Sequence, residues 1–254
     1  MPDERFLSGK HAVVTGASRG IGAATALTLA AQGAHLTLMG RDQGALNKVS
    51  AAIPDSKAVI CDVTDAAAVT RVFEAAHKRA PVAILVNNAG MAQSAPFLRT
   101  DDAMLNQIFA TNVMSAFRCT RAALPDMLAA GWGRVVNIAS IAGLKGARYI
   151  SAYAASKHAL VGMTRALAAE TADKNITVNA VCPGYVDTEL TRGAIANIMT
   201  RTGRSEKEAL AEVVRGNPHG RLITPEEVAA TVAFLCGPES GSINGQAIAI
   251  GDIA

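Results

Sequence analysis

Aromatic side chains are scarce in this chain of 254 residues: they make up 4% of it and include a single tryptophan, although half of the residues are hydrophobic. A core of this composition has to be built mainly from Ala, Val, Ile and Leu, as is typical of helices packed on a buried parallel sheet. No apolar run approaches the roughly 18 residues of a membrane-spanning helix. The length suits one large α/β domain and does not require a second.

Cysteine and histidine are also sparse. The four cysteines are far apart, show no CxxC spacing and lie in apolar contexts, which predicts buried free thiols at Cys61, Cys119, Cys182 and Cys236. The five histidines form no HxxxH or HxH group, so we expect no metal site.

The charge of the chain is small and evenly spread. A formal net charge of +3, with scattered basic residues, disfavours nucleic acid as a partner. The opening residues MPDERFLSGKHAVV carry acidic groups where a signal peptide needs a basic end and an apolar stretch. We therefore expect a cytoplasmic protein with no membrane partner.

Short Val/Ile/Leu-rich runs alternate with longer Ala-rich stretches of helical period, which indicates βαβ units. Residues 1–254 are accordingly predicted to form a single α/β domain of the Rossmann type. It would have a doubly wound, seven-stranded parallel sheet with helices on both faces. The predicted strands are 11–15, 34–39, 57–61, 82–87, 134–139, 175–181 and 246–250. The predicted helices are 20–32, 43–53, 65–79, 101–130, 152–173 and 225–236.

One long interval breaks this rhythm. Residues 184–224 are polar and helical in two pieces with no strand, which suggests an insertion over the carboxyl edge of the sheet. A lid at about 185–224 is one interpretation, and a solvated surface excursion is the other.

The first predicted strand runs into TGASRGIG, residues 15–22, where a helix begins. Glycines at such a junction permit a tight turn, let a phosphate approach the backbone and allow close packing of helix on strand. The exposed N–H groups and the positive end of the helix then favour a pyrophosphate. The strand before and the helix after distinguish this sequence from an ordinary glycine turn and predict a nucleotide site that includes Gly16, Ser18, Arg19, Gly20, Ile21 and Gly22.

The end of the second strand bears on the choice of nucleotide. NAD-binding proteins usually hold the ribose hydroxyls with an acid there, whereas LMGRD places Gly40 at this point and Arg41 directly after it. Arg41, with Arg19, can bind the 2′-phosphate of NADP, which predicts NADP(H). NAD(H) stays possible, because a shifted register would put Asp42 in the acid's place.

Tyr153 and Lys157 stand four residues apart and share one helix face. Such a pair is by default a surface contact. Here, however, the glycine turn, the loop Asn87-Asn88-Ala89-Gly90, Ser140 and the Pro183-Gly184 pair all follow strand ends and are expected at the same carboxyl edge.

TGASRGIG, NNAG, a serine after NIA, YxxxK and VNAVCPG occur in the order and spacing of the short-chain dehydrogenase/reductase family, which the chain resembles from about residue 9 to 250. Within that family it is similar to 3-oxoacyl carrier-protein reductases, polyketide ketoreductases and hydroxyacyl dehydrogenases. The resemblance implies a catalytic tetrad of Asn112, Ser140, Tyr153 and Lys157. It also implies cofactor contacts that, with the glycine turn and Arg41, comprise Asp62, Val63, Asn88, Ala89, Gly90, Tyr153, Lys157, Pro183, Gly184, Val186 and Thr188.

In this family-derived scheme Tyr153 transfers the proton, Ser140 binds the substrate oxygen, and Asn112 holds a water that links Lys157 to solvent. A lysine ammonium and an oxidised nicotinamide nearby are expected to lower the tyrosine pKa by about 1–3 units. The family commonly forms tetramers, so a homo-oligomer, tetramer or dimer, is expected. The ending AIAIGDIA lacks the glycine pair of many relatives, which leaves this expectation open.

The sequence thus predicts an NADP(H)-dependent oxidoreductase that acts on a carbonyl or secondary alcohol, such as a 3-oxoacyl thioester or a similar ketone. Arg148, Arg192, Arg201 and Arg204 could meet a phosphopantetheine or coenzyme A group, or could be ordinary surface charge. One alternative is an NAD-dependent secondary alcohol or 3-hydroxyacyl-CoA dehydrogenase. The other, from a different class, is a catalytically silent binding or scaffold protein with this fold.

Overall fold

Short aliphatic runs form a seven-stranded parallel sheet in the order β3-β2-β1-β4-β5-β6-β7. The computed structural model describes residues 5–251, so residues 1–4 and 252–254 lie outside it, and with them the last residues of the AIAIGDIA ending. The strands are β1 (His11–Thr15), β2 (His35–Gly40), β3 (Ser56–Ile60), β4 (Val82–Asn87), β5 (Gly133–Ile138), β6 (Ile176–Pro183) and β7 (Ala247–Ile250). All seven predicted strands are confirmed, with ends that differ by no more than about two residues.

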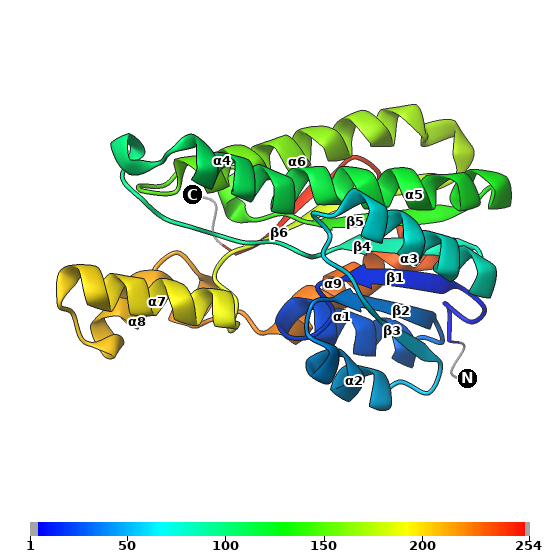
Figure 1. Ribbon diagram of the computed structural model, residues 1–254, viewed down its shortest axis with the longest axis horizontal. Coiled ribbons are helices and arrows are strands. Elements are labelled where there is room, and N and C mark those ends of the chain that lie inside the picture. Colours follow the sequence, from blue (N-terminus) through cyan, green and yellow to red (C-terminus); the bar gives the residue numbers. More distant parts are fainter. Residues whose placement is uncertain (1–4, 252–254) are drawn as a thin grey trace.

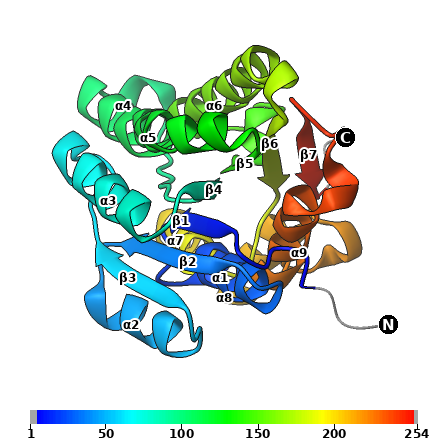
Figure 2. The ribbon, with the colours of Figure 1, turned by 90° about the vertical axis from the view of Figure 1, so that its right-hand side faces the viewer.

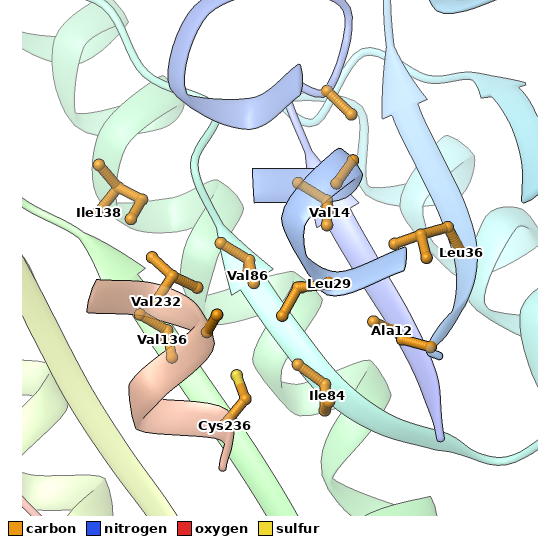
Figure 3. Close-up of a cluster of buried hydrophobic side chains, with 14 of the residues drawn as sticks. Ala12, Val14, Leu29, Leu36, Ile84, Val86, Val136, Ile138, Val232 and Cys236 are labelled. Atoms are coloured by element: carbon orange, nitrogen blue, oxygen red, sulfur yellow. The ribbon is translucent and has the colours of Figure 1, made fainter. Parts of the chain in front are cut away.

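Helices cover both faces of the sheet (Figures 1 and 2). One face carries α1 (Gly20–Ala31), α2 (Gln43–Ala51) and α9 (Pro225–Cys236), and the other carries α3 (Ala66–Arg79), α5 (Ser115–Ala130) and α6 (Ser151–Glu170). Alternate strand residues supply the two cores. Val14 packs towards α1 and α9, whereas its neighbour Val13 packs towards α3 and α5. Figure 3 shows the first core, in which Leu29 and Val232 meet the aliphatic side chains of the central strands.

The predicted helix 101–130 is wrong as a single α-helix. The structure has α4 (Asp102–Phe109), then a π-helical turn over Ala110–Met114, then α5. A π-turn inserts one residue into the hydrogen-bond ladder and is frequent at functional sites. The buried side chain in this turn is Asn112, whose partners are described with the site.

The interval 184–224 contains α7 (Glu189–Thr202) and α8 (Glu206–Val214), which lie apart from the sheet layers in Figure 1. The two helices pack on one another through a small apolar cluster of Ile195, Ala209 and Val213, bordered by Ile198, Met199 and Leu222. The interval forms no named strand among its described residues, but Val186 and Ile223 make an isolated parallel bridge.

Within residues 5–251, no helix is both long and apolar enough to cross a membrane. No group of three or more His, Cys, Asp or Glu side chains in this range is placed to hold a metal ion. The four cysteines are buried and free, as predicted. Burial raises the pKa of each thiol, so all four stay protonated near neutral pH.

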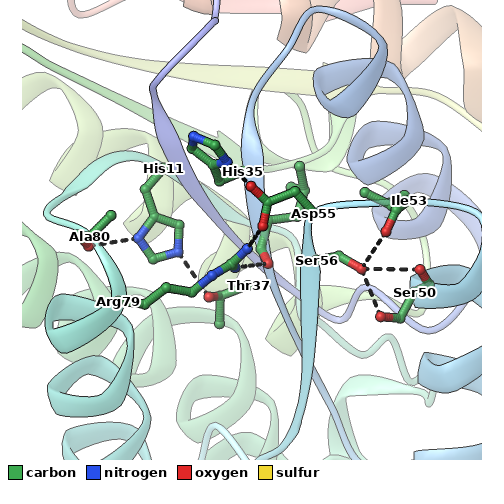
Figure 4. A network of polar contacts seen from close by, with 10 residues as sticks. His11, His35, Thr37, Ser50, Ile53, Asp55, Ser56, Arg79 and Ala80 are labelled. Atoms are coloured by element: carbon green, nitrogen blue, oxygen red, sulfur yellow. Dashed lines mark hydrogen bonds and ion pairs between the residues drawn. The ribbon is translucent and has the colours of Figure 1, made fainter.

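A polar network lies at the amino ends of the strands (Figure 4). His11 is buried, and its Nδ1 lies 2.8 Å from the Ala80 carbonyl oxygen, which can only accept. Nδ1 therefore carries the proton, and Nε2, 2.8 Å from Thr37 Oγ1, accepts from the hydroxyl. Nearby, Arg79 and His35 both bind the carboxylate of Asp55.

Burial lowers the pKa of His11, the hydrogen bond with the Ala80 carbonyl opposes this in part, and the positive charge of Arg79 lowers the pKa a little further. As pH falls through about 6.5, the unfolded chain takes up a proton at this histidine before the folded protein does. The free energy of unfolding should therefore fall. His11→Leu should cost about 1–3 kcal/mol at pH 7.5, because it leaves buried polar groups unpaired, yet it should lose less stability than the wild type on going to pH 5.5.

Thermal or urea unfolding at both pH values measures this difference, and His35 and His77 are retained in both proteins. The exposed His158, replaced by Gln, is the matched control and should keep the wild-type pH dependence. An unchanged pH dependence in His11→Leu would contradict the assignment.

Candidate active site at the carboxyl edge of the sheet

A cleft of about 190 Å³ opens at the carboxyl ends of the strands. It lies where β1 and β4 are neighbours, the point at which the strand order reverses and where ligands of such sheets bind. Segments far apart in the sequence supply its walls. They comprise Arg19, Gly20, Ile21, Asn88, Gly90, Met91, Ile138, Ala139, Ser140, Tyr153, Lys157, Pro183, Gly184, Val186, Thr188, Leu190 and Thr191.

The glycine turn has no room for side chains. Gly16 and Gly20 have positive φ angles of 64° and 53°, which favour glycine. A Cβ on Gly22 would lie 2.5 Å from Asn88 Nδ2 and would also collide with the Gly16 carbonyl, so glycine is required for the close approach of α1 to β1. The spacing of TGASRGIG therefore reflects packing constraints as well as ligand access.

Thr15 and Asn88 tie the turn to the end of β4. The Thr15 hydroxyl is buried and accepts the backbone N–H groups of Asn88 and Ala89, each at 2.9 Å. The Asn88 side chain donates in return to the carbonyl oxygens of Thr15 at 2.9 Å and Gly16 at 3.1 Å. These bonds hold two neighbouring strand ends together beyond the point where their ladder stops.

The amino end of α1 fits a phosphate group. Its N-cap residue, Arg19, is extended and gives no side-chain cap to the helix, and the first turn contains no acidic residue. The first N–H groups of the helix and its positive dipole end thus face the cleft without an internal counter-charge. With the cradle that Gly16 and Gly20 keep open, these residues fit the pyrophosphate of a dinucleotide.

Four charged residues lie beyond the ends of β1, β2 and β3, and they differ in their partners. Arg41 is exposed directly after β2, which ends at Gly40. The Asp42 carboxylate accepts from the Ala45 N–H at 3.0 Å and caps α2. Asp62 accepts from the backbone and hydroxyl of Thr64, and these bonds, with Arg41 as a lesser contributor, lower its pKa. Arg19, from the glycine turn, forms an ion pair with Glu189 at the start of α7.

Ser140, Tyr153 and Lys157 meet at the cleft, as the sequence predicts. Ser140 follows β5, and its hydroxyl accepts the Ala142 N–H at 3.1 Å. Lys157 is buried and donates from Nζ to the Ile138 carbonyl oxygen at 2.8 Å, with the Tyr153 ring centroid 5.8 Å from Nζ. Burial lowers the Lys157 pKa to about 8.

The expected lowering of the Tyr153 pKa is not found in the protein by itself. Burial raises this pKa, and the hydrogen bond with Ser140 only partly opposes that effect. The physical reason is that desolvation disfavours the phenolate, while Lys157 is directed to the Ile138 carbonyl. Tyr153 is therefore held as a neutral phenol, a proton donor, near neutral pH.

Asn112 reaches the site from the π-turn but does not line the cleft. Its Oδ1 accepts the Met91 N–H at 2.8 Å, and its Nδ2 donates to the Met91 carbonyl at 2.9 Å and to Ser156 Oγ at 3.0 Å. The side-chain amide thus fixes the loop after β4 and ties it to α6. Its part in holding a water stays a prediction.

The other predicted cofactor residues lie behind or beside the cleft wall. Gly16, Ser18, Gly22 and Ala89 belong to the turn and its support, Arg41 and Asp62 follow β2 and β3, and Val63 packs in the core below. Thr15, Met91, Leu190 and Ser156 are not among the site residues predicted from the sequence. Thr15 could have been found, because it opens the TGASRGIG motif, whereas the other three depend on contacts between distant segments.

The comparison with known families agrees with this geometry. A family model described as short chain dehydrogenase matches residues 10–198, which is well over half of the chain. The chain belongs to the short-chain dehydrogenase family. As a member of this family the protein is an oxidoreductase, and the intact Ser140, Tyr153 and Lys157 fit that activity.

Relatives of this short-chain dehydrogenase span nearly its full length. It is 39% identical over 96% of its residues to galactitol 2-dehydrogenase (L-tagatose-forming) of Cereibacter sphaeroides, of which 94% is covered. It is 38% identical to the 3-oxoacyl-acyl-carrier-protein reductase of Escherichia coli, with 94% and 95% of the two chains covered. A crystal structure of a variant actinorhodin polyketide ketoreductase with NADPH matches with a TM-score of 0.91 and 35% identity, over 95% of each chain.

The tie between β1 and β4 can be tested with two isosteric substitutions. Thr15→Val should lower the free energy of unfolding by about 1–3 kcal/mol, because it leaves the partly buried N–H groups of Asn88 and Ala89 without an acceptor. It should also weaken nucleotide binding. Thr25→Val is the matched control, since Thr25 Oγ1 is buried with no hydrogen-bond partner among the described residues. It should be neutral or stabilising in denaturant unfolding. Equal effects of the two substitutions would refute the role of the Thr15 hydroxyl.

Proposed function

We propose that this short-chain dehydrogenase is an NADPH-dependent reductase of ketones, with a 3-oxoacyl thioester or a similar ketone as substrate. The observation that carries the proposal is the convergence of Ser140, Tyr153 and Lys157 on the cleft that also contains the open amino end of α1. A proton donor, a hydrogen-bond donor for oxygen and a phosphate cradle are the parts that carbonyl reduction requires.

In this mechanism, the amino end of α1 and Arg41 would hold NADPH, which would supply the hydride. Tyr153 donates its phenolic proton to the carbonyl oxygen of the substrate, and its raised pKa keeps that proton in place until it is needed. The Ser140 hydroxyl donates a hydrogen bond to the same oxygen as negative charge develops there. Lys157, protonated below about pH 8, stabilises the tyrosinate that remains.

The preference for NADPH rests on the residues after β2. Arg41 is exposed and available to a 2′-phosphate. Asp42, which would bind the ribose hydroxyls of NAD in the alternative register, instead caps α2 with its carboxylate. The NADPH in the actinorhodin ketoreductase structure supports the same choice. Arg19 is paired with Glu189 and would have to exchange that partner to reach the phosphate.

The substrate class rests on the ketoacyl reductases among the relatives. The basic residues of the 185–224 segment give limited support to a coenzyme A or phosphopantetheine contact, because Arg192 is paired with Asp187 and Arg204 with Glu212. Arg148 and Arg201 are exposed and stay available to such a group. We also propose that the 185–224 segment, an insertion after the sixth strand, is a lid and that the enzyme is cytoplasmic. The family resemblance further supports a homo-oligomer.

A second candidate is oxidation of a secondary alcohol with NAD, which the similarity to galactitol 2-dehydrogenase favours. Oxidation would require Tyr153 to act as a base, against the direction in which burial moves its pKa. An activity screen separates the two candidate functions. It follows the oxidation of NADPH and NADH, and the reduction of their oxidised forms, with ketones, polyols and acyl thioesters as substrates.

Replacing the proton donor should reduce turnover far more than it weakens nucleotide binding. Tyr153→Phe should lower kcat by about 10²- to 10⁴-fold, the usual contribution of general acid catalysis, while the Kd for NADPH stays within about twofold of the wild type. Steady-state kinetics and fluorescence titration measure the two quantities. Near-normal turnover in this variant would remove Tyr153 from the proton transfer.

Nucleotide choice can be tested at neighbouring positions. Arg41→Ala should raise the Kd for NADPH by about ten- to a hundredfold, if charge-assisted bonds of about 1.5–3 kcal/mol are lost, and should leave the Kd for NADH unchanged. Asp42→Ala, which removes the cap of α2, should lower stability by about 1 kcal/mol without altering the NADPH Kd. A loss of NADH binding in Asp42→Ala would instead support the NAD register.

A further inference from the structure

The segment that carries α7 and α8 is joined to the rest of the protein by two stems, 184–188 and 217–224. The outgoing stem follows β6 and includes Gly184, Val186 and Thr188, which all line the cleft. The returning stem leads into α9. The position of the cleft wall therefore depends on what holds the two stems together.

Two backbone hydrogen bonds join the stems but cover only a short stretch. Val186 and Ile223 form the parallel bridge, in which the Ile223 N–H donates to the Tyr185 carbonyl at 3.0 Å and the Asp187 N–H donates to the Ile223 carbonyl at 2.8 Å. A bridge of this length is weak by itself, since an isolated pair of strands is only marginally stable in water.

The side chain of Asn217 completes the junction. It is only 5% exposed, and its Oδ1 accepts the Tyr185 N–H at 3.0 Å. Its Nδ2 donates to the Tyr185 carbonyl at 2.7 Å and to the Arg221 carbonyl at 2.9 Å. The amide thus pairs with both backbone groups of Tyr185, as a neighbouring strand would. Its bond to the Arg221 carbonyl also closes the turn over residues 217–221.

The neighbouring backbone fits this side chain closely. A Cβ on Gly184 would lie 2.5 Å from Asn217 Oδ1, so the position next to Tyr185 requires glycine. His219 and Gly220 have positive φ angles of 62° and 60°, which turn the chain back so that the Arg221 carbonyl meets the amide.

We propose that Asn217 is a positioning residue, a clasp that closes the base of the 185–224 segment and thereby fixes the cleft wall at Gly184, Val186 and Thr188. The proposal rests on the proposed nucleotide site at this wall. The helices α7 and α8 have their own apolar cluster, which does not require the clasp. Loss of the clasp should therefore act on ligand binding while α7 and α8 keep their packing.

Asn217→Asp is the sharpest test, because the two side chains are nearly isosteric. The carboxylate keeps an acceptor for the Tyr185 N–H but faces two carbonyl oxygens to which the amide donates. The Kd for NADPH at pH 8 should rise by about tenfold or more. At pH 6 the variant should recover part of its affinity relative to the wild type, because a protonated carboxyl can again donate one hydrogen bond.

The matched control is Asn106→Asp, which introduces the same charge at an exposed position of α4 and should leave binding unchanged at both pH values. A Kd of Asn217→Asp within twofold of the wild type at pH 8 would overturn the proposal. So would an equal loss at pH 6 and pH 8, which indicates a general structural defect rather than a missing donor.

Hydrogen exchange of the wild-type protein gives a test that needs no variant and no ligand. The amides of Tyr185, Asp187 and Ile223 should exchange together and more slowly than the exposed amides of α8, since the clasp and bridge open as one unit. Rapid, independent exchange of these amides would contradict the clasp. Failure of the wild type to bind NADPH or NADH would refute the proposed function instead, and the exchange result would still decide the clasp.

Discussion

The bond network between Thr15 and Asn88 is the constraint on which the site depends. Parallel strands diverge where their ladder stops, and the N–H and carbonyl groups beyond that point need other partners. The Thr15 hydroxyl takes two of these N–H groups and the Asn88 amide donates to two carbonyls. Because Gly16 and Gly22 fit against Asn88, the same network also sets the distance of α1 from β1 and keeps the phosphate cradle open.

The same device recurs around the cleft. Asn112 pairs with the backbone N–H and carbonyl of Met91, and Asn217 does so with Tyr185. An amide side chain offers a donor and an acceptor in nearly the geometry of a peptide group, so it can substitute for a strand that is not there. Loops that carry the cleft wall are thereby fixed although they belong to no sheet. Their buried polar groups stay satisfied, which low-dielectric surroundings demand.

The pKa values of Tyr153 and Lys157 are set by burial more than by pairing with charged groups. Desolvation raises the pKa of Tyr153 and brings that of Lys157 down to about 8, so both groups are moved towards their neutral forms. The phenol is consequently poised as an acid, and the lysine is close to its titration point. A bound ligand that adds charge to the cleft can change either group strongly, because there is little water to screen it.

The strands, the sheet class, the glycine turn and the convergence of Ser140, Tyr153 and Lys157 could all be predicted from the sequence. These features follow from local periodicity, from the steric demands of glycine and from the rule that parallel strands end at one edge. The tertiary structure alone decided the π-turn at Asn112, the direction of the Tyr153 pKa shift and the partners of Ser156, Asn217 and Arg19. Each of these depends on contacts between segments far apart in the chain, and burial of a group is set by all the elements packed around it.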